Sequence, residues 1–143
     1  MDLLLIARDG LANSVASIML TALEAKKAGV DVGVLFTQEA LRCVAGEGVL
    51  RWSPGLTGQE LRLRIADVAI AANLPISGGK GEGRELEPLA LLESAKKAGV
   101  AVYACPLWTR LLKLERLPDG IKVMEQAQLV KALVDTKKVI GTL

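Results

Sequence analysis

The chain alternates short, uninterrupted apolar runs with segments of helical periodicity, and this alternation restricts its fold more than any other feature. Residues 3–7 (LLLIA) and 100–104 (VAVYA) are hydrophobic at every position. Such runs are typical of strands buried on both faces of a parallel sheet. Between them, apolar residues recur at helical spacing from Val15 to Leu23, and the helix is expected to end at Gly29, a residue suited to a left-handed C-cap.

The same reading extends along the whole chain. We expect five strands, at residues 3–7, 30–36, 67–72, 100–104 and 139–143. We expect helices from about residue 14 to 28, then at 37–44, from 57 up to the third strand, and at 84–98, 106–114 and 125–135, with loops at 46–55 and 73–83 and a turn at 117–122. Strands that alternate with helices predict a mainly parallel sheet with helices on both faces and right-handed crossovers. A chain of 143 residues is the usual size of one α/β domain.

Composition and charge narrow the classes of partner. The sequence is 51% hydrophobic with a mean hydropathy of +0.36, which favours a homo-oligomer that buries apolar surface between its subunits. The longest apolar runs fall far short of the roughly 20 residues that cross a bilayer, and residues 1–10 lack the features of a signal peptide, so no membrane span is expected. The net charge is only +2 with no basic block, so nucleic-acid binding is not expected.

The chain has no histidine and only two cysteines, which excludes several kinds of chemistry. A Ser-His-Asp triad, a Cys-His pair and an HExxH zinc site all require histidine. Two cysteines argue against a disulfide scaffold and against a structural zinc site, so we expect a cytoplasmic protein without a metal or cofactor.

Ligands of open α/β sheets bind beyond the carboxyl ends of the strands. The expected strands are followed there by small, polar or reactive residues, and these are the pocket candidates. They are Arg8, Asp9, Thr37, Gln38, Asn73, Cys105, Pro106 and Trp108.

Cys105 is the best candidate for chemistry. Residues 95–106 (AKKAGVAVYACP) repeat the pattern of residues 25–36 (AKKAGVDVGVLF), which places Cys105 at the last position of a strand. The helix that follows would present its positive end to the sulfur and favour the reactive thiolate. The alternative is a buried cysteine that only fills space. Cys43 could be a second thiol, although a packing role is the simpler interpretation.

Three other features have a functional and a structural interpretation. The loop at residues 77–83 (SGGKGEG) is neither a Walker loop nor a GxGxxG motif, so it could bind phosphate, close over the site or contact a subunit. Asp9 could be a catalytic carboxylate, but Asp before Gly after a strand is more often a turn residue. Trp108 could line the site or pack at a subunit interface.

The sequence resembles the DsrE/DsrF-like family, a superfamily that includes the sulfur-relay subunit TusD. The resemblance is carried by LLLIARDG, ANSVASIMLTALEAKKAG, VDVGVLFTQEAL, ADVAIAANLPI, AKKAGVAVYACPLWTRL and the closing segment from LPDGIK to the end. It implies a flavodoxin-like three-layer sandwich that assembles into dimers, trimers or hexamers. It also implies that Cys105, which ends the strand VAVYAC, carries a persulfide.

Two functions follow from these observations. The first is a sulfur carrier, or sulfurtransferase-like protein, that takes sulfur from a donor protein and passes it from Cys105 to an acceptor thiol. The alternative is a non-catalytic module on the same fold that binds a small ligand or assembles with a partner. Nucleotide binding through residues 77–83 is a weaker third.

Overall fold

The computed structural model describes residues 1–141 of the chain, and its centre is a five-stranded sheet in which all neighbouring strands are parallel. The spatial order is β6-β5-β2-β1-β7. The strands are β1 (Leu3–Ala7), β2 (Val32–Phe36), β5 (Ala101–Ala104), β6 (Ile121–Val123) and β7 (Lys138–Gly141). The expected α/β fold with a mainly parallel five-stranded sheet is confirmed.

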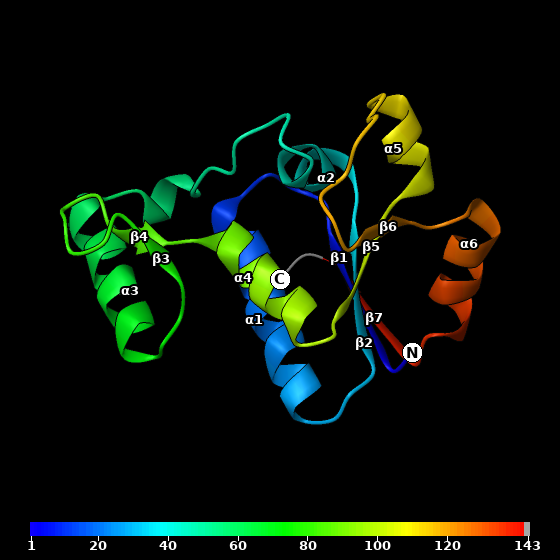
Figure 1. Cartoon of the computed structure of the whole chain (residues 1–143), viewed down its shortest axis with the longest axis horizontal. Helices are drawn as coiled ribbons and strands as arrows, with labels where there is room; N and C mark the ends of the chain where they lie inside the picture. Colours follow the sequence, from blue (N-terminus) through cyan, green and yellow to red (C-terminus); the bar gives the residue numbers. More distant parts are fainter. Residues whose placement is uncertain (142–143) are drawn as a thin grey trace.

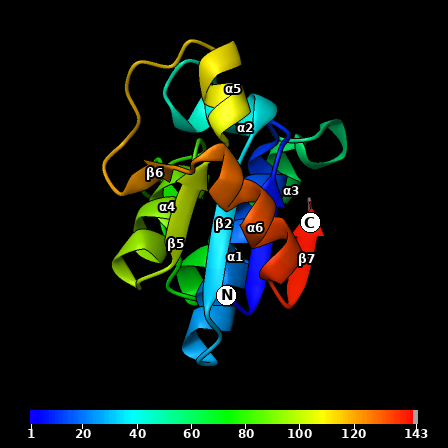
Figure 2. The ribbon, with the colours of Figure 1, turned by 90° about the vertical axis from the view of Figure 1, so that its right-hand side faces the viewer.

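Helices cover both faces of this sheet and make a three-layer sandwich (Figure 1). The helices α1 (Ala12–Lys27) and α4 (Pro88–Lys97) lie side by side on one face, and α6 (Gln126–Asp135) covers the other. The short helices α2 (Gln38–Val44) and α5 (Pro106–Leu111) lie beyond the carboxyl ends of the strands (Figure 2).

The path of the chain explains why α6 lies apart from α1 and α4. From β1 to β2 to β5 the chain moves across the sheet in one direction, with α1 and α4 on one face. From β6 it returns past the other strands and adds β7 beside β1. Because crossovers between parallel strands are right-handed, this reversed step requires its helix on the opposite face.

Side chains alternate between the two faces of each strand and build two cores. Leu5, Val34 and Phe36 are fully buried in the larger core, under α1 and α4. Leu4 and Leu35 point the other way into a smaller core, under α6. Both cores are built almost entirely from aliphatic side chains, in keeping with an aromatic content of 3%.

Between β2 and α4 the chain leaves the sheet and forms a separate lobe, residues 54–86 (Figure 1). The lobe contains the short 3₁₀ helix η1 (Pro54–Leu56), the helix α3 (Gln59–Ala71) and an antiparallel hairpin of β3 (Ile76–Ser77) and β4 (Glu85–Leu86). Ion pairs tie the helix to the hairpin: Arg84 Nε donates to Asp67 at 2.7 Å, and Arg62 pairs with Glu85.

The lobe corrects three expectations. The third expected strand, residues 67–72, is wrong, because these residues complete and follow α3. The run DVAIAA is short enough to fit either structure, and its alanines favour a helix. The loop expected at residues 73–83 contains β3, and the helix expected at residues 84–98 begins only at Pro88, after β4.

The fifth strand of the sheet lies near the end of the chain and not at residues 67–72, where it was expected. Residues 117–122 were expected to form only a turn, but Ile121–Val123 is β6, which pairs with β5 at the edge of the sheet. The final strand is shifted slightly: β7 is Lys138–Gly141, and residues 142–143 of the expected strand lie outside the described part of the chain.

Candidate functional site

Cys105 lies where the sequence places it, directly after β5 and at the start of α5. Its backbone N–H donates to the carbonyl of Phe36 on β2 at 2.9 Å, which continues the sheet pairing by one residue. Its carbonyl accepts from Thr109 twice, from N at 2.9 Å and from Oγ1 at 2.8 Å. Pro106 begins α5, since proline suits the first turn of a helix. Cys105 is therefore fixed by hydrogen bonds on both sides.

The side chain of Cys105 lies in the smaller core. It is 7% exposed and packs in a cluster with Leu4, Leu35, Met124 and Leu129. Leu129 belongs to α6, so this helix forms one wall of the cluster. Cys105 thus belongs to an apolar cluster, with little of its surface in contact with solvent.

Two of these neighbours were not predicted because they depend on β6. The backbone N–H of Met124, which follows β6, donates to the carbonyl of Ala104 at 3.1 Å, one residue before Cys105. The alternation in Ile121-Lys122-Val123 is the only signal for this strand in the sequence, and it spans just three residues. Glu125 and Gln128 then form a capping box that starts α6 and brings Leu129 over the cluster.

Arg8 and Asp9 follow β1 at the same edge of the sheet. The Arg8 side chain is exposed, and its carbonyl accepts from Ala40 N at 3.1 Å. The Asp9 carboxylate accepts from Leu11 N at 3.1 Å, which is the hydrogen bond of an Asx turn. Asp9 is therefore a turn residue between β1 and α1, which was the alternative to a catalytic carboxylate.

Thr37 and Gln38 follow β2. Thr37 is 9% exposed, and its N–H donates to the Ala7 carbonyl at 2.9 Å. Gln38 is exposed and has a φ of +53°, a left-handed conformation that is unfavourable for a residue with a side chain. The turn from β2 into α2 is consequently tight and strained. It lies at the same edge of the sheet as Cys105, which follows β5.

Pro106 is buried and Trp108 is half-buried. Trp108 packs against both the larger and the smaller core, so it lies at their boundary above the strand ends. The structure therefore brings Arg8, Asp9, Thr37, Gln38, Pro106 and Trp108 to the same edge of the sheet as Cys105.

Asn73 does not belong to this edge. It follows α3 in the lobe, with a φ of +59° and its N–H donating to the Ile70 carbonyl at 3.0 Å. It was placed at the edge because residues 67–72 were expected to be a strand, and its real role is to end the helix. The glycine loop at residues 77–83 joins β3 to β4 in the lobe, so it does not follow a strand of the main sheet either.

Cys43 belongs to a different environment from Cys105. It is 4% exposed on α2 and lines a cavity of about 260 Å³ together with Trp52 and Glu85. Burial raises the pKa of the Cys43 thiol, and the charge of Glu39 adds to the rise. Both cysteines are free thiols, so no disulfide joins them.

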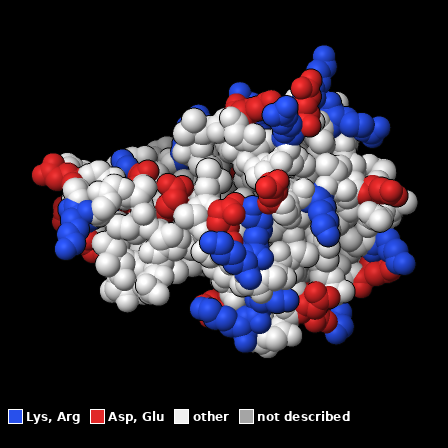
Figure 3. Space-filling view, viewed as in Figure 1, with Lys and Arg blue, Asp and Glu red and all other residues white. Residues whose placement is uncertain are grey.

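The remaining polar groups give little support to other chemistry. Within residues 1–141, no three side chains among His, Cys, Asp and Glu are arranged to hold a metal ion. Cationic and anionic side chains are intermixed over the face of the molecule shown in Figure 3. In the same described part, no helix has the length and apolar character to span a bilayer. The Cys105 thiol lies at the carboxyl edge of the sheet, and thiols as a class exchange with disulfides and persulfides without a metal.

Comparison with known proteins supports the fold. No family model and no curated protein matches the sequence. Among solved structures, the YchN protein from E. coli is similar, with 16% sequence identity, a TM-score of 0.60 and 99% of each chain covered. The likeness extends over the entire domain, and at this identity it shows that the chain shares the fold of YchN.

Proposed function

We propose that this protein is a sulfur carrier that holds a persulfide on Cys105 and passes the outer sulfur to an acceptor thiol. The observation that carries the proposal is the position of Cys105, a free thiol at the junction of β5 and α5, at the carboxyl edge where open α/β sheets generally bind ligands. The resemblance to the DsrE/DsrF-like family and the fold shared with YchN support it.

The reaction consists of two thiol exchanges. The Cys105 thiolate attacks the outer sulfur of a donor persulfide; a new S–S bond forms, the donor S–S bond breaks, and the donor leaves as a thiolate. The acceptor thiolate then attacks the outer sulfur on Cys105, which regenerates the Cys105 thiolate. Each step moves one sulfur atom and consumes no external oxidant or reductant.

The surroundings of Cys105 suit a carrier in one further respect. A persulfide reacts readily with other thiols, so a carrier must keep it from unintended partners between the two exchanges. The cluster under α6 leaves Cys105 7% exposed, which limits access by small thiols in solution. Transfer would then require an acceptor that approaches the carboxyl edge or displaces part of the cluster.

Intact-mass measurement after incubation with a small-molecule persulfide donor tests the proposal. We expect wild type and Cys43→Ser to gain one sulfur atom, and Cys105→Ser to gain none. Cys43→Ser is a matched control because it removes the other buried thiol. If wild type gains no sulfur, or if Cys105→Ser gains as much as wild type, Cys105 is not the carrier.

One observation favours a second function, a binding or assembly module in which Cys105 only packs. Cys105 is 7% exposed and belongs to an apolar cluster with Leu35, Met124 and Leu129, as an inert buried cysteine would. In that case Cys105→Ala would retain fold and partner binding, and the wild-type thiol would stay unreactive until unfolding.

We also propose that the protein is a homo-oligomer. Val130 and Val134 of α6 are 53% and 76% exposed and form an apolar strip along the outer side of the sandwich. Sedimentation velocity of wild type and Val134→Glu tests this: wild type should sediment as an oligomer, and the variant as a smaller species. A wild type that is monomeric at high concentration would overturn the proposal.

A further inference from the structure

The outer face of α5 is an exposed apolar surface directly beside Cys105. Cys105 is the N-cap residue of this helix, and α5 has six residues, so its far end lies only about 9 Å from Cys105. Leu107 and Leu111 are 45% and 59% exposed, and because they are four residues apart they share one face of the helix. Figure 2 shows α5 at the end of the molecule, beyond the carboxyl ends of the strands.

The other face of α5 fixes the helix to the body. Trp108 packs against both cores, and Thr109 Oγ1 donates to the Cys105 carbonyl at 2.8 Å. Leu107 and Leu111 are members of neither core, so they are not needed for this packing. Apolar patches with a polar rim often mark protein contact sites on soluble proteins. The outer face of α5 is therefore a candidate contact surface.

Cationic side chains accompany these leucines. Arg110, Lys113 and Arg116 are exposed, and none of them forms an ion pair within residues 1–141. Residues 106–116 contain a single carboxylate, that of Glu115. An excess of one charge attracts a partner of the opposite charge and raises the rate of encounter. The charge of this surface thus complements an acidic partner.

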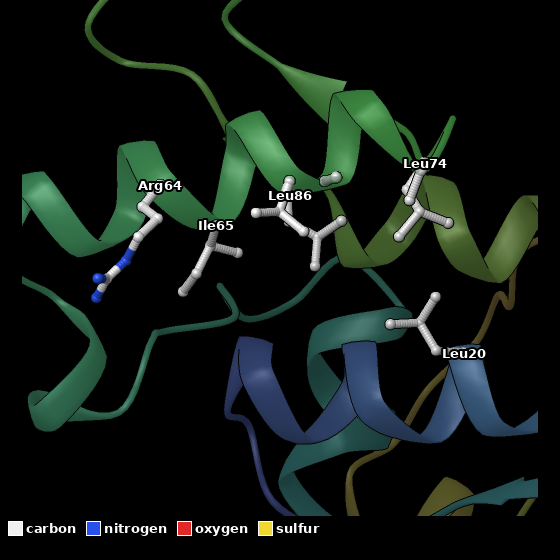
Figure 4. A pocket seen from close by; sticks show the side chains of 8 residues that line it. Leu20, Arg64, Ile65, Leu74 and Leu86 are labelled. Carbon is white, nitrogen blue, oxygen red and sulfur yellow. The ribbon is translucent and has the colours of Figure 1, made fainter.

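A second apolar surface of the molecule lacks such a charge pattern. Figure 4 shows a groove of about 370 Å³ with Leu20 of α1 on one side and Ile65 and Leu86 of the lobe on the other. The side chains that face this groove are aliphatic, so they do not distinguish one apolar occupant from another. Figure 1 shows α3 and α5 on opposite sides of the molecule, so the groove is remote from the thiol. Exposed residues of α3 can therefore serve as controls for α5.

We infer that the outer face of α5 is the docking surface for the protein that exchanges sulfur with Cys105, and that this partner presents apolar side chains ringed by carboxylates. The inference rests on the sulfur-carrier proposal, because it names the kind of partner that the reaction requires. Cys105 is 7% exposed, which limits its encounters with small thiols. A protein held on α5 keeps its own thiol within one short helix of the sulfur.

Sulfur transfer from Cys105 to synthetic peptides tests the inference. The Cys43→Ser protein is loaded from a small-molecule persulfide donor, and intact mass confirms one added sulfur atom. Each acceptor peptide has a central cysteine between two leucines, with glutamates outside them in one peptide and lysines in the other. Each transfer rate is divided by the rate of the same peptide with free cysteine persulfide, which removes differences in thiol reactivity. The acidic peptide should react about tenfold faster at low ionic strength, and the difference should shrink in concentrated salt.

Variants with matched controls locate the surface. Arg110→Gln should slow transfer to the acidic peptide about threefold and should not slow transfer to the lysine peptide. Leu111→Ser should slow both peptides about threefold, because the apolar contact is common to them. Arg64→Gln and Val68→Ser are the controls and should alter neither rate. Arg64 is exposed without an ion pair in the described part of the chain, and Val68 is 64% exposed; both belong to α3.

Three results would overturn the inference, and they separate it from the sulfur-carrier proposal. If Cys105 loads but both peptides react at equal rates that Arg110→Gln does not change, α5 does not dock an acidic partner, while the carrier proposal stands. If Cys105 gains no sulfur, the carrier proposal fails and the inference fails with it. If the acidic peptide has no advantage and the protein instead co-sediments with phosphatidylserine vesicles in a way that Leu111→Ser abolishes, the face binds a lipid surface.

Discussion

Replacement of Leu129 by alanine should expose Cys105 to reagents, because α6 is the helix that covers its cluster. Leu129 is 9% exposed and is the residue of α6 that is buried in this cluster. If α6 must move to uncover the thiol, weakening its contact should raise the reaction rate of Cys105 in the native protein.

The size of the effect follows from the burial of Leu129. Buried leucine-to-alanine substitutions cost about 2–5 kcal/mol, and the lower end applies here because the residue lies at the margin of a small core. A loss of about 2 kcal/mol increases the population of the open form by about 30-fold. Modification of Cys105 by an uncharged thiol reagent should accelerate by the same factor when opening precedes reaction.

The assay is the rate of iodoacetamide modification of Cys105 in a Cys43→Ser background, with stability measured by urea unfolding. Leu133→Ala is the matched control: the residue is on the same helix but is 42% exposed and lies outside the cluster. Its effect should stay near 0.5 kcal/mol, with a rate within about threefold of the parent.

An unchanged rate in Leu129→Ala, with stability lowered as expected, would refute this reasoning. Cys105 would then be reached directly from the carboxyl edge, past Trp108, without movement of α6. Equal acceleration in both variants would also refute it, because the contact with the cluster would not be the cause.

Cys43, the Asp2–Lys137 pair and Gln38 give three further expected outcomes. Burial raises the pKa of Cys43, so iodoacetamide should modify it more slowly than free cysteine at mildly alkaline pH, and the pH dependence of the rate measures this. The carboxylate of Asp2 accepts a hydrogen bond from Lys137, and this bond lowers the pKa of Asp2 below 3.8. The pair therefore stabilises the fold above that value and loses its effect as pH falls through the lower folded pKa, so Asp2→Asn should reduce the urea midpoint at neutral pH and not in strong acid. Gln38→Gly should raise stability by about 0.5–1 kcal/mol in urea unfolding, because glycine accepts the left-handed φ at some entropic cost, whereas Gln38→Val should lower it.

The sequence was sufficient where burial alone decides the structure. The run at residues 3–7 forms β1 and most of the run at residues 100–104 forms β5, because a strand of a parallel sheet covered on both faces buries consecutive apolar side chains. Residues 67–72 were misassigned because the five apolar residues after Asp67 suit a strand or a helix, and only their packing in the lobe distinguishes the two.

The candidate site was predictable in part for the same reason. Cys105 could be placed from the repeated strand pattern, and the residues after β1 and β2 from the rule for parallel sheets. Met124 and Leu129 could not, because β6 has three residues and forms only through its pairing with β5. Asn73 was wrongly predicted to lie at this edge, because the residues before it were expected to form a strand and belong to α3.

The position of α6 in the chain has a consequence for biosynthesis. A chain emerges from the ribosome from its N-terminus, so β5 and Cys105 appear before the helix that covers them. Until α6 crosses the sheet and β7 pairs with β1, the thiol lies on an uncovered apolar surface. Protection of Cys105 is thus among the last features that the folding chain acquires, and the nascent protein passes through a stage in which its thiol is open to oxidants and to foreign thiols.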